Sequence, residues 1–186
     1  MGEFELLAKL RERLPDDGPR VRLGSGDDAA IVVPGGATAT SVDAIVEGVH
    51  FRRGEAELRL VGRKAMATAL SDLAAMGAEA GEAYVVLGAP ADLGEAGFLD
   101  LLDGLLELAA ATGTTLAGGD VTSSPVLSLA VTVVGHAPAA EDLVTRAGAR
   151  PGDLLAVTGE LGPAAAGLLV LEKDVSGHER LVRRYL

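Results

Sequence analysis

The sequence of 186 residues contains no cysteine and no tryptophan. Without cysteine there can be no disulfide, no thiolate metal ligand and no cysteine nucleophile. No stretch approaches the roughly 18 uninterrupted apolar residues of a membrane-spanning helix. The first residues, MGEFE, are acidic where a signal peptide would be basic. These absences predict a soluble, cytoplasmic protein that does not enter a membrane.

Basic residues are in the minority. The chain has 16 Lys and Arg residues against 27 Asp and Glu residues, which gives a formal net charge of −11. A field of this sign repels nucleic acid and anionic lipid, so neither is an expected partner. An acidic protein can bind a polyphosphate where bound divalent cations reverse the local charge. The alternative is that the charge serves only solubility.

Aromatic residues are also few, with three Phe and two Tyr, although 48% of the residues are hydrophobic. Most of these are Ala, Leu and Val, so the predicted core is aliphatic. The length suits one generous domain, or one domain and the start of a second.

Apolar residues recur at helical spacing in residues 4–14, 57–76 and 94–112. Gly77 and Gly113 follow the second and third of these segments and predict their ends. Strands are predicted at residues 20–23, 29–33, 38–46, 83–87, 114–117 and 126–135. The Pro-Gly-Gly turn at 34–36 predicts a hairpin between 29–33 and 38–46. The predicted fold is α+β, with helices on one face of a mainly antiparallel sheet.

A second unit is predicted after a turn at residues 150–153. A strand at 154–157 is followed by helices at 164–171 and 179–186, and Pro163 suits the first turn of a helix. The predicted domains are therefore 1–150 and 151–186. The partners of the second domain's elements are absent from the sequence, so we expect it to be cut off at Leu186.

The glycine-rich segment at residues 24–29 has the letters of a dinucleotide fingerprint, GxGxxA. That motif must open a helix, whereas a strand is predicted here, and no Walker A sequence exists. A glycine loop could instead present Asp27 and Asp28 to a cation. The alternative is that the acids bond only to their own backbone.

Further acids stand at unusual places. Ser41 and Asp43 are two residues apart on a predicted strand and share one face, which suits a hard cation or simply faces solvent. Asp72 lies late in an apolar helix, where a carboxylate opposes the helix dipole and risks burial without a partner. A nearby cation would resolve both problems. The alternative is a partly exposed acid, or one paired with Arg63 or Lys64.

Three other positions carry weaker indications. Gly118, Gly119 and Asp120 are predicted to form a loop in which a ligand could approach the backbone, or a simple turn. Arg146 could contact phosphate or only face solvent. His50 could have a structural role or a catalytic one.

Seven motifs together carry a family resemblance. They are GEFELL at residues 2–7, GSGDDAA at 24–30, SVDAIVEGVHF at 41–51, KA at 64–65, LSDLAAMGA at 70–78, GGDVT at 118–122 and TRAGARPGD at 145–153. In this order they resemble thiamine-monophosphate kinase, whose superfamily includes aminoimidazole ribonucleotide synthetase and selenophosphate synthetase. The stretches VEGVHF and LSDLAAMGA are specific to this kinase among its relatives.

The resemblance implies direct in-line transfer of the terminal phosphoryl group of ATP to thiamine monophosphate, assisted by a magnesium cluster. The implied metal ligands are Asp27, Ser41, the main-chain carbonyl of Val42, Asp43, Asp72 and Asp120. Gly119, Asp120 and Arg146 would contact ATP, and His50 would contact thiamine monophosphate. Phosphoryl transfer depends on positioning and charge stabilisation, and magnesium prefers oxygen ligands, so the chemistry suits these residues.

The resemblance also implies an assembly. Residues 1–150 would bind metal and ATP and pair with a second copy in a shared β-barrel, so a homodimer is expected. Family members carry a complete second α/β domain, so this chain is expected to bind ligand with little or no turnover. The alternatives are aminoimidazole ribonucleotide synthetase activity and a non-catalytic, dimerising nucleotide-binding remnant. Selenophosphate synthetase and the hydrogenase-maturation relative are disfavoured because both use cysteine or selenocysteine chemistry.

Overall fold

The computed structural model describes residues 3–25, 27–173 and 175–185. Its chain divides into two compact units, Met1–Val144 and Thr145–Leu186. In the described ranges, no helix combines the length and the apolar character needed to cross a membrane.

The first unit is built on a four-stranded sheet. Its strands are β3 (Ala37–Val46), β4 (Glu79–Ala89), β5 (Thr115–Ser123) and β6 (Ser128–Ala137), in the order β3-β6-β4-β5. The β3–β6 and β6–β4 pairs are antiparallel, and the β4–β5 pair is parallel. The sheet is therefore mixed, and the predicted α+β class is confirmed. A parallel pair needs a crossover connection, which a helix supplies here.

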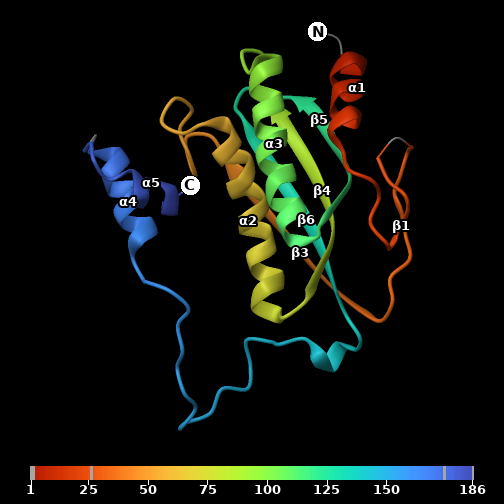
Figure 1. Cartoon of the computed structure of the whole chain (residues 1–186), viewed down its shortest axis with the longest axis vertical. Coiled ribbons are helices and arrows are strands. Elements are labelled where there is room, and N and C mark those ends of the chain that lie inside the picture. The colour runs from red at the N-terminus through yellow and green to blue at the C-terminus, as the bar shows by residue number, and fades with distance from the viewer. Residues whose placement is uncertain (1–2, 26, 174, 186) are drawn as a thin grey trace. The chain divides into compact units, whose positions relative to one another are not determined.

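Two long helices cover one face of this sheet (Figure 1): α2 (Leu58–Met76) and α3 (Gly94–Thr112). Gly77 and Gly113 end them in the left-handed conformation, with φ of 69° and 70°, as predicted. Between helices and sheet lies an aliphatic core. Its largest fully buried side chains in the described ranges are Val61, Met66, Leu73, Leu101, Leu127, Leu129, Val131 and Val133.

The two helices touch backbone to backbone through glycines. A Cβ atom at Gly62 would lie 2.0 Å from the carbonyl oxygen of Leu101, and one at Gly104 would lie 1.8 Å from that of Arg59. No other residue type fits this separation without moving a helix. We call this contact the glycine lock.

The N-terminal segment adds a helix and a small sheet. Helix α1 (Glu3–Arg13) is joined to α3 by the ion pairs Lys9–Glu95 and Arg13–Asp103. Strands β1 (Val21–Leu23) and β2 (Ile31–Val32) pair antiparallel as a separate two-stranded sheet.

The hairpin predicted between residues 29–33 and 38–46 is wrong. Strand β2 pairs with β1, whereas β3 pairs with β6 from Ala37 onward. Gly36 has φ of 93°, and a Cβ atom there would lie 2.4 Å from the Ala137 carbonyl oxygen. The glycine therefore lets the chain enter the sheet beside the end of β6 instead of turning back on itself.

The loop predicted at Gly118–Asp120 is also wrong, because β5 runs through all three residues. A Cβ atom at Gly119 would lie 2.1 Å from the carbonyl oxygen of Val85 on β4. The glycine here allows two strands to approach closely.

The second unit contains two packed helices, α4 (Pro163–Glu172) and α5 (Glu179–Tyr185). Pro163 opens α4, as expected from its fixed φ. Residues 154–157 do not form the predicted strand, and the side chains of Leu154 and Leu155 are each 98% exposed. A strand is stable only when its backbone groups find a partner strand, and the described part of this unit offers none.

Candidate functional site

The clearest site contact joins β3 to α2. The Ser41 hydroxyl donates a hydrogen bond to Asp72 Oδ2 at 2.5 Å. Asp43 lies on the same face of β3 as Ser41, because alternate residues of a strand point to the same face. Ile45, the next residue on this face, is buried under the helices. The structure thus brings a hydroxyl and a carboxylate together, with a second carboxylate two residues along.

Asp72 is exposed, so the expectation that its carboxylate risks burial without a partner was wrong. Its observed partner is the Ser41 hydroxyl, while Arg63 pairs with Glu107 at 3.7 Å. An exposed carboxylate near a hydroxyl can accept a cation without a large desolvation cost.

Asp120 lies on the other face of the sheet. A row of paired residues runs from Asp43 through Val131 and Val85 to Gly119. Because consecutive residues of a strand point to opposite faces, Asp120 points away from the face that carries Asp43. Val42, likewise, lies on the open face of β3, where its side chain is 63% exposed.

Asp27 lies in a pocket with the glycine pair of β5. The pocket has a volume of about 720 Å³ and is bounded by residues 24–25 and 27–30 on one side and by Ala117, Gly118 and Gly119 on the other. Asp27 Oδ1 accepts a hydrogen bond from the Asp28 amide at 2.8 Å, which is the local backbone bond foreseen as the alternative to cation binding. Tyr84 also lines this pocket, and burial raises the pKa of its phenol, with a further contribution from the charge of Glu82.

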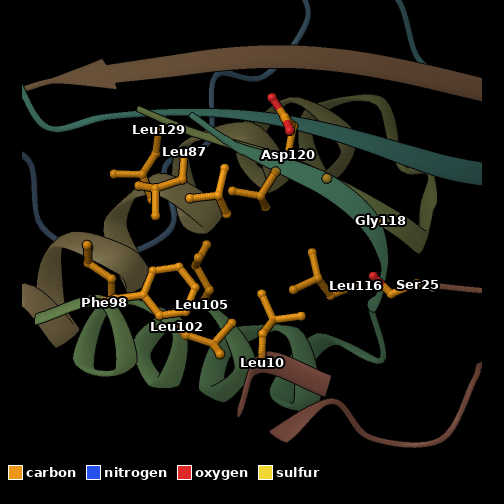
Figure 2. A pocket seen from close by; sticks show the side chains of 14 residues that line it. Leu10, Ser25, Leu87, Phe98, Leu102, Leu105, Leu116, Gly118, Asp120 and Leu129 are labelled. Atoms are coloured by element: carbon orange, nitrogen blue, oxygen red, sulfur yellow. The ribbon is translucent and has the colours of Figure 1, made fainter. Parts of the chain in front are cut away.

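A small apolar cavity of about 80 Å³ lies next to the glycine pair (Figure 2). Phe98, Leu102 and Leu105 of α3 line one side, and Ser25, Gly118 and Asp120 also border it. Figure 2 shows the Asp120 carboxylate directed away from the leucine side chains. Sequence reasoning missed this cavity, since it forms only where α3 packs under β5.

The predicted metal ligands are therefore found at three places: Ser41, Asp43 and Asp72 at the β3–α2 edge, Asp27 in the loop pocket, and Asp120 with Val42 on the open face. Within the described ranges, no group of three or more His, Asp or Glu side chains is arranged to hold a metal ion. The predicted ligands at the β3–α2 edge are a hydroxyl and two carboxylates, which are oxygen donors of the kind that Mg²⁺ accepts. Magnesium is usually held by one or two carboxylates together with substrate phosphates and water, so Asp43 and Asp72 fit that chemistry.

His50 lies in the turn that follows β3. Its ring Nδ1 accepts a hydrogen bond from the Val46 amide at 3.1 Å, and Lys64 Nζ donates to its carbonyl oxygen at 3.2 Å. The imidazole is exposed. Lys64 is partly buried, and burial lowers the pKa of its ammonium group.

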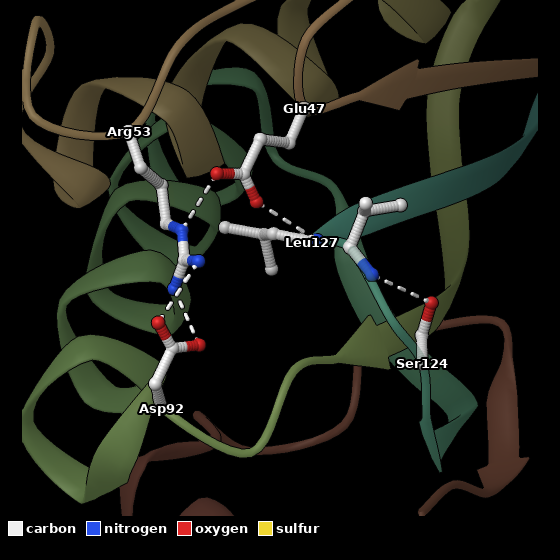
Figure 3. Close-up of polar contacts among 6 residues, drawn as sticks. Glu47, Arg53, Asp92, Ser124 and Leu127 are labelled. Atoms are coloured by element: carbon white, nitrogen blue, oxygen red, sulfur yellow. Dashed lines mark hydrogen bonds and ion pairs between the residues drawn. The ribbon is translucent and has the colours of Figure 1, made fainter.

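An ion-pair network that sequence reasoning missed holds the same turn (Figure 3). Arg53 Nε donates to Glu47 Oε1 at 2.8 Å, and its two terminal nitrogens donate to the Asp92 carboxylate at 3.0 and 3.1 Å. Glu47 also accepts the Leu127 amide at 3.1 Å. The guanidinium lowers the pKa of the Glu47 and Asp92 carboxyls, and these carboxylates raise the pKa of Arg53, with Asp92 contributing most.

Arg146, the remaining predicted ATP contact, belongs to the second unit, where it is exposed.

The chain belongs to a known family. Residues 26–137 match the model of the AIR synthase related protein, N-terminal domain. Among curated relatives, the thiamine-monophosphate kinase of Mycobacterium tuberculosis (strain CDC 1551 / Oshkosh) is 39% identical over 189 residues, which cover 100% of this chain and 56% of that protein. The resemblance inferred from the motifs is thus confirmed.

Solved structures agree with this relationship. Thiamine-monophosphate kinase from Stenotrophomonas maltophilia K279a has a TM-score of 0.80 and 34% identity, over 95% of this chain and 55% of that one. AaThiL complexed with AMPPCP and TMP has a TM-score of 0.75 and 26% identity, over 100% of this chain and 58% of that one. The chain therefore spans only a little over half the length of these relatives.

Proposed function

We propose that this chain is the metal- and nucleotide-binding part of a thiamine-monophosphate kinase, an enzyme that transfers the terminal phosphoryl group of ATP to thiamine monophosphate. The observation that carries the proposal is the 39% identity to a kinase of this name along the whole chain. The AaThiL complex with AMPPCP and TMP supports the same pair of ligands.

In this proposal Asp43 and Asp72 hold Mg²⁺ at the β3–α2 edge, and Ser41 keeps Asp72 oriented through their hydrogen bond. Bound magnesium would supply positive charge to the phosphate oxygens. Asp27, Asp120 and the Val42 carbonyl serve as further ligands. Since Asp27 and Asp120 both lie near the Gly118–Gly119 pair, we propose that they serve a separate cation at the nucleotide.

The pocket between residues 24–25 and 27–30 on one side and the glycine pair on the other is the proposed nucleotide site. Its volume of about 720 Å³ is within the range of small-molecule sites. Gly119 allows a phosphate to approach the backbone, and Asp120 is the other proposed ATP contact of the first unit. Arg146 is a proposed ATP contact of the second unit. His50 is the proposed contact to the phosphate acceptor, thiamine monophosphate.

The chain is also proposed to form a homodimer through residues 1–150, with residues 151–186 as a separate domain and the cytoplasm as its compartment. The sheet face away from the helices exposes Val42 (63%) and Val86 (45%). Exposed apolar side chains gathered on one face of a sheet favour an interface. A second copy covering this face would form the shared β-barrel, and sedimentation of wild-type and Val42→Asp chains tests it, because only the wild type should dimerise.

Calorimetry with ATP and excess Mg²⁺ tests the metal proposal. Asp43→Asn and Asp72→Asn should each weaken magnesium-dependent ATP binding by roughly tenfold or more, because each removes a charged ligand. Asp100→Asn, which neutralises an exposed acid on α3, is the matched control. Unchanged ATP affinity in both site variants would remove Asp43 and Asp72 from the site.

The substrate is tested separately, with the chain and with a full-length relative carrying the same substitutions. ADP formation should require thiamine monophosphate. Dependence on a formylglycinamidine ribotide instead would assign the chain to aminoimidazole ribonucleotide synthetase activity. Nucleotide binding without any acceptor binding would indicate a non-catalytic module.

A further inference from the structure

The pocket beside the glycine pair of β5 contains both signs of charge. Among the described residues that line it, Asp27 and Asp28 are acidic, and Arg11 of α1 is the one basic residue. Two carboxylates repel a polyphosphate unless positive charge lies beside them. A bound cation is one source of such charge, and Arg11 is a second source that the pocket itself provides.

Helix α1 directs Arg11 away from the partners that its other basic residues use. Lys9 and Arg13 are four residues apart and share one face of the helix, where they pair with Glu95 and Asp103 of α3. Arg11 lies two residues from each, on a different face, and lines the pocket. Its guanidinium makes no ion pair with any other described residue. The charge of Arg11 is therefore not neutralised by a carboxylate of the described chain.

Tyr84 of β4 brings a second hydrogen-bond donor into the same pocket. It stands opposite Gly118 in the β4–β5 pairing, and a Cβ atom at Gly118 would lie 3.3 Å from the Tyr84 ring. The ring is partly buried, and its hydroxyl makes no hydrogen bond with any other described residue. Burial, with a contribution from the charge of Glu82, raises the pKa of the phenol. The hydroxyl thus keeps its hydrogen at neutral pH and can donate it.

A guanidinium and a phenol that lack acceptors, in one pocket, favour a ligand that carries several acceptor oxygens and negative charge. A phosphate group has both, and its hydrogen bonds to a guanidinium are charge-assisted. An uncharged ligand would satisfy the phenol of Tyr84 but would leave the charge of Arg11 unpaired. The anionic part of a nucleotide therefore fits these two residues better than its base does.

We propose that Arg11 and Tyr84 are further binding residues for the phosphate chain of the nucleotide, with the Arg11 guanidinium and the Tyr84 hydroxyl each donating hydrogen bonds to phosphate oxygens. The proposal rests on the proposed nucleotide site. It assigns to that site two residues that lie outside all seven motifs of the family resemblance.

Calorimetry of the full chain with magnesium–ATP tests these contacts. Arg11→Gln should weaken binding roughly tenfold, because it removes a charge-assisted hydrogen bond. Tyr84→Phe keeps the ring and removes only the hydroxyl, so its loss should be about threefold. Arg13→Gln is the matched control, since it removes the same charge from the same helix at a residue paired with Asp103, and its affinity should change less than about twofold.

NMR tests the contact of Tyr84 directly. The chain has only two tyrosines, so carbon-13 labelling of tyrosine gives two sets of ring signals, and Tyr185→Phe identifies those of Tyr84. Magnesium–ATP should shift the Tyr84 signals. Inorganic triphosphate with magnesium should shift them too, because it carries the phosphates without the base, whereas adenosine should leave them in place.

The outcomes separate this proposal from the nucleotide site itself. If Arg11→Gln and Tyr84→Phe bind magnesium–ATP as tightly as wild type, the role of the two residues is overturned and the nucleotide site stands. An equal loss in Arg13→Gln would also overturn it, because the effect of charge would then be general. Tyr84 signals that respond to adenosine but not to triphosphate would overturn the phosphate contact. If wild-type chain binds neither magnesium–ATP nor triphosphate, the nucleotide site fails and the role of both residues fails with it.

Discussion

Replacing Gly119 with alanine should destabilise the first unit, because it places a methyl group where β5 and β4 touch. The added Cβ would lie 2.1 Å from the Val85 carbonyl oxygen and 3.0 Å from its carbonyl carbon, both of which belong to the backbone of a paired strand. Neither atom can rotate away, so β5 must move by about 1 Å. Overpacking of this kind costs about 1–3 kcal/mol, and a weakened ladder hydrogen bond adds about 1 kcal/mol.

We therefore expect a loss of about 3 kcal/mol in the free energy of unfolding, or about 6–12 °C in Tm for a chain of this size. Urea unfolding followed by circular dichroism measures it. Gly118→Ala is the matched control, because its Cβ would meet only the Tyr84 ring, at 3.3 and 3.6 Å, and a side chain can yield. The free energy of unfolding of this control variant should stay within about 1 kcal/mol of the wild-type value.

Equal stability of the two alanine variants would refute the reasoning, since Gly119 would then not be pressed against β4. The comparison also bears on ligand binding. If Gly119→Ala is destabilised as expected, its loss of nucleotide affinity cannot by itself be read as loss of a ligand contact.

Three further outcomes are expected. Leu101→Ala, at a position with 1% exposure, should cost about 2–5 kcal/mol in urea unfolding, and a loss below 1 kcal/mol would contradict its place in the core. Gly77→Ala should cost about 1 kcal/mol, because φ is 69° at this helix end; an unchanged Tm would contradict that conformation. The folded pKa of Glu47 is below its ordinary value of 4.5, so its contribution is present above that value and is lost as pH falls through the folded pKa. In Glu47→Gln, the free energy of unfolding should thus fall less steeply as the pH decreases through the acidic range. An unchanged decrease would contradict the pairing of Glu47 with Arg53.

The helices were predictable because their determinants are local. Apolar spacing and a following glycine are enough to place α2 and α3, and the predicted bounds of α3 coincide with the observed Gly94–Thr112. Strand partners are not local. The Pro-Gly-Gly segment at 34–36 has the composition of a hairpin turn, yet the competing pairing with β6 extends over the whole of β3 from Ala37 to Val46. Glycines at 118–119 have the composition of a loop, and only the presence of β4 reveals close strand packing.

In the candidate site, too, features with local determinants were predictable and features that depend on distant partners were not. Period-two spacing placed Ser41 and Asp43 on one face, whereas the hydrogen bond from Ser41 to Asp72 joins two elements and had no local signal. That Asp120 faces the other way depends on the register of four strands, which no local pattern contains. The Arg53 network was not foreseen, because Arg53 and Asp92 are 39 residues apart.

The glycine lock also limits how this unit can move. Helix α2 carries Asp72 and Lys64, while α3 borders the cavity beside the glycine pair of β5. Carbonyl oxygens pressed against Gly62 and Gly104 leave no room for one helix to slide or roll over the other. A ligand that draws the two regions together must therefore do so by bending the segments outside the helices, so that α2 and α3 move as a single body.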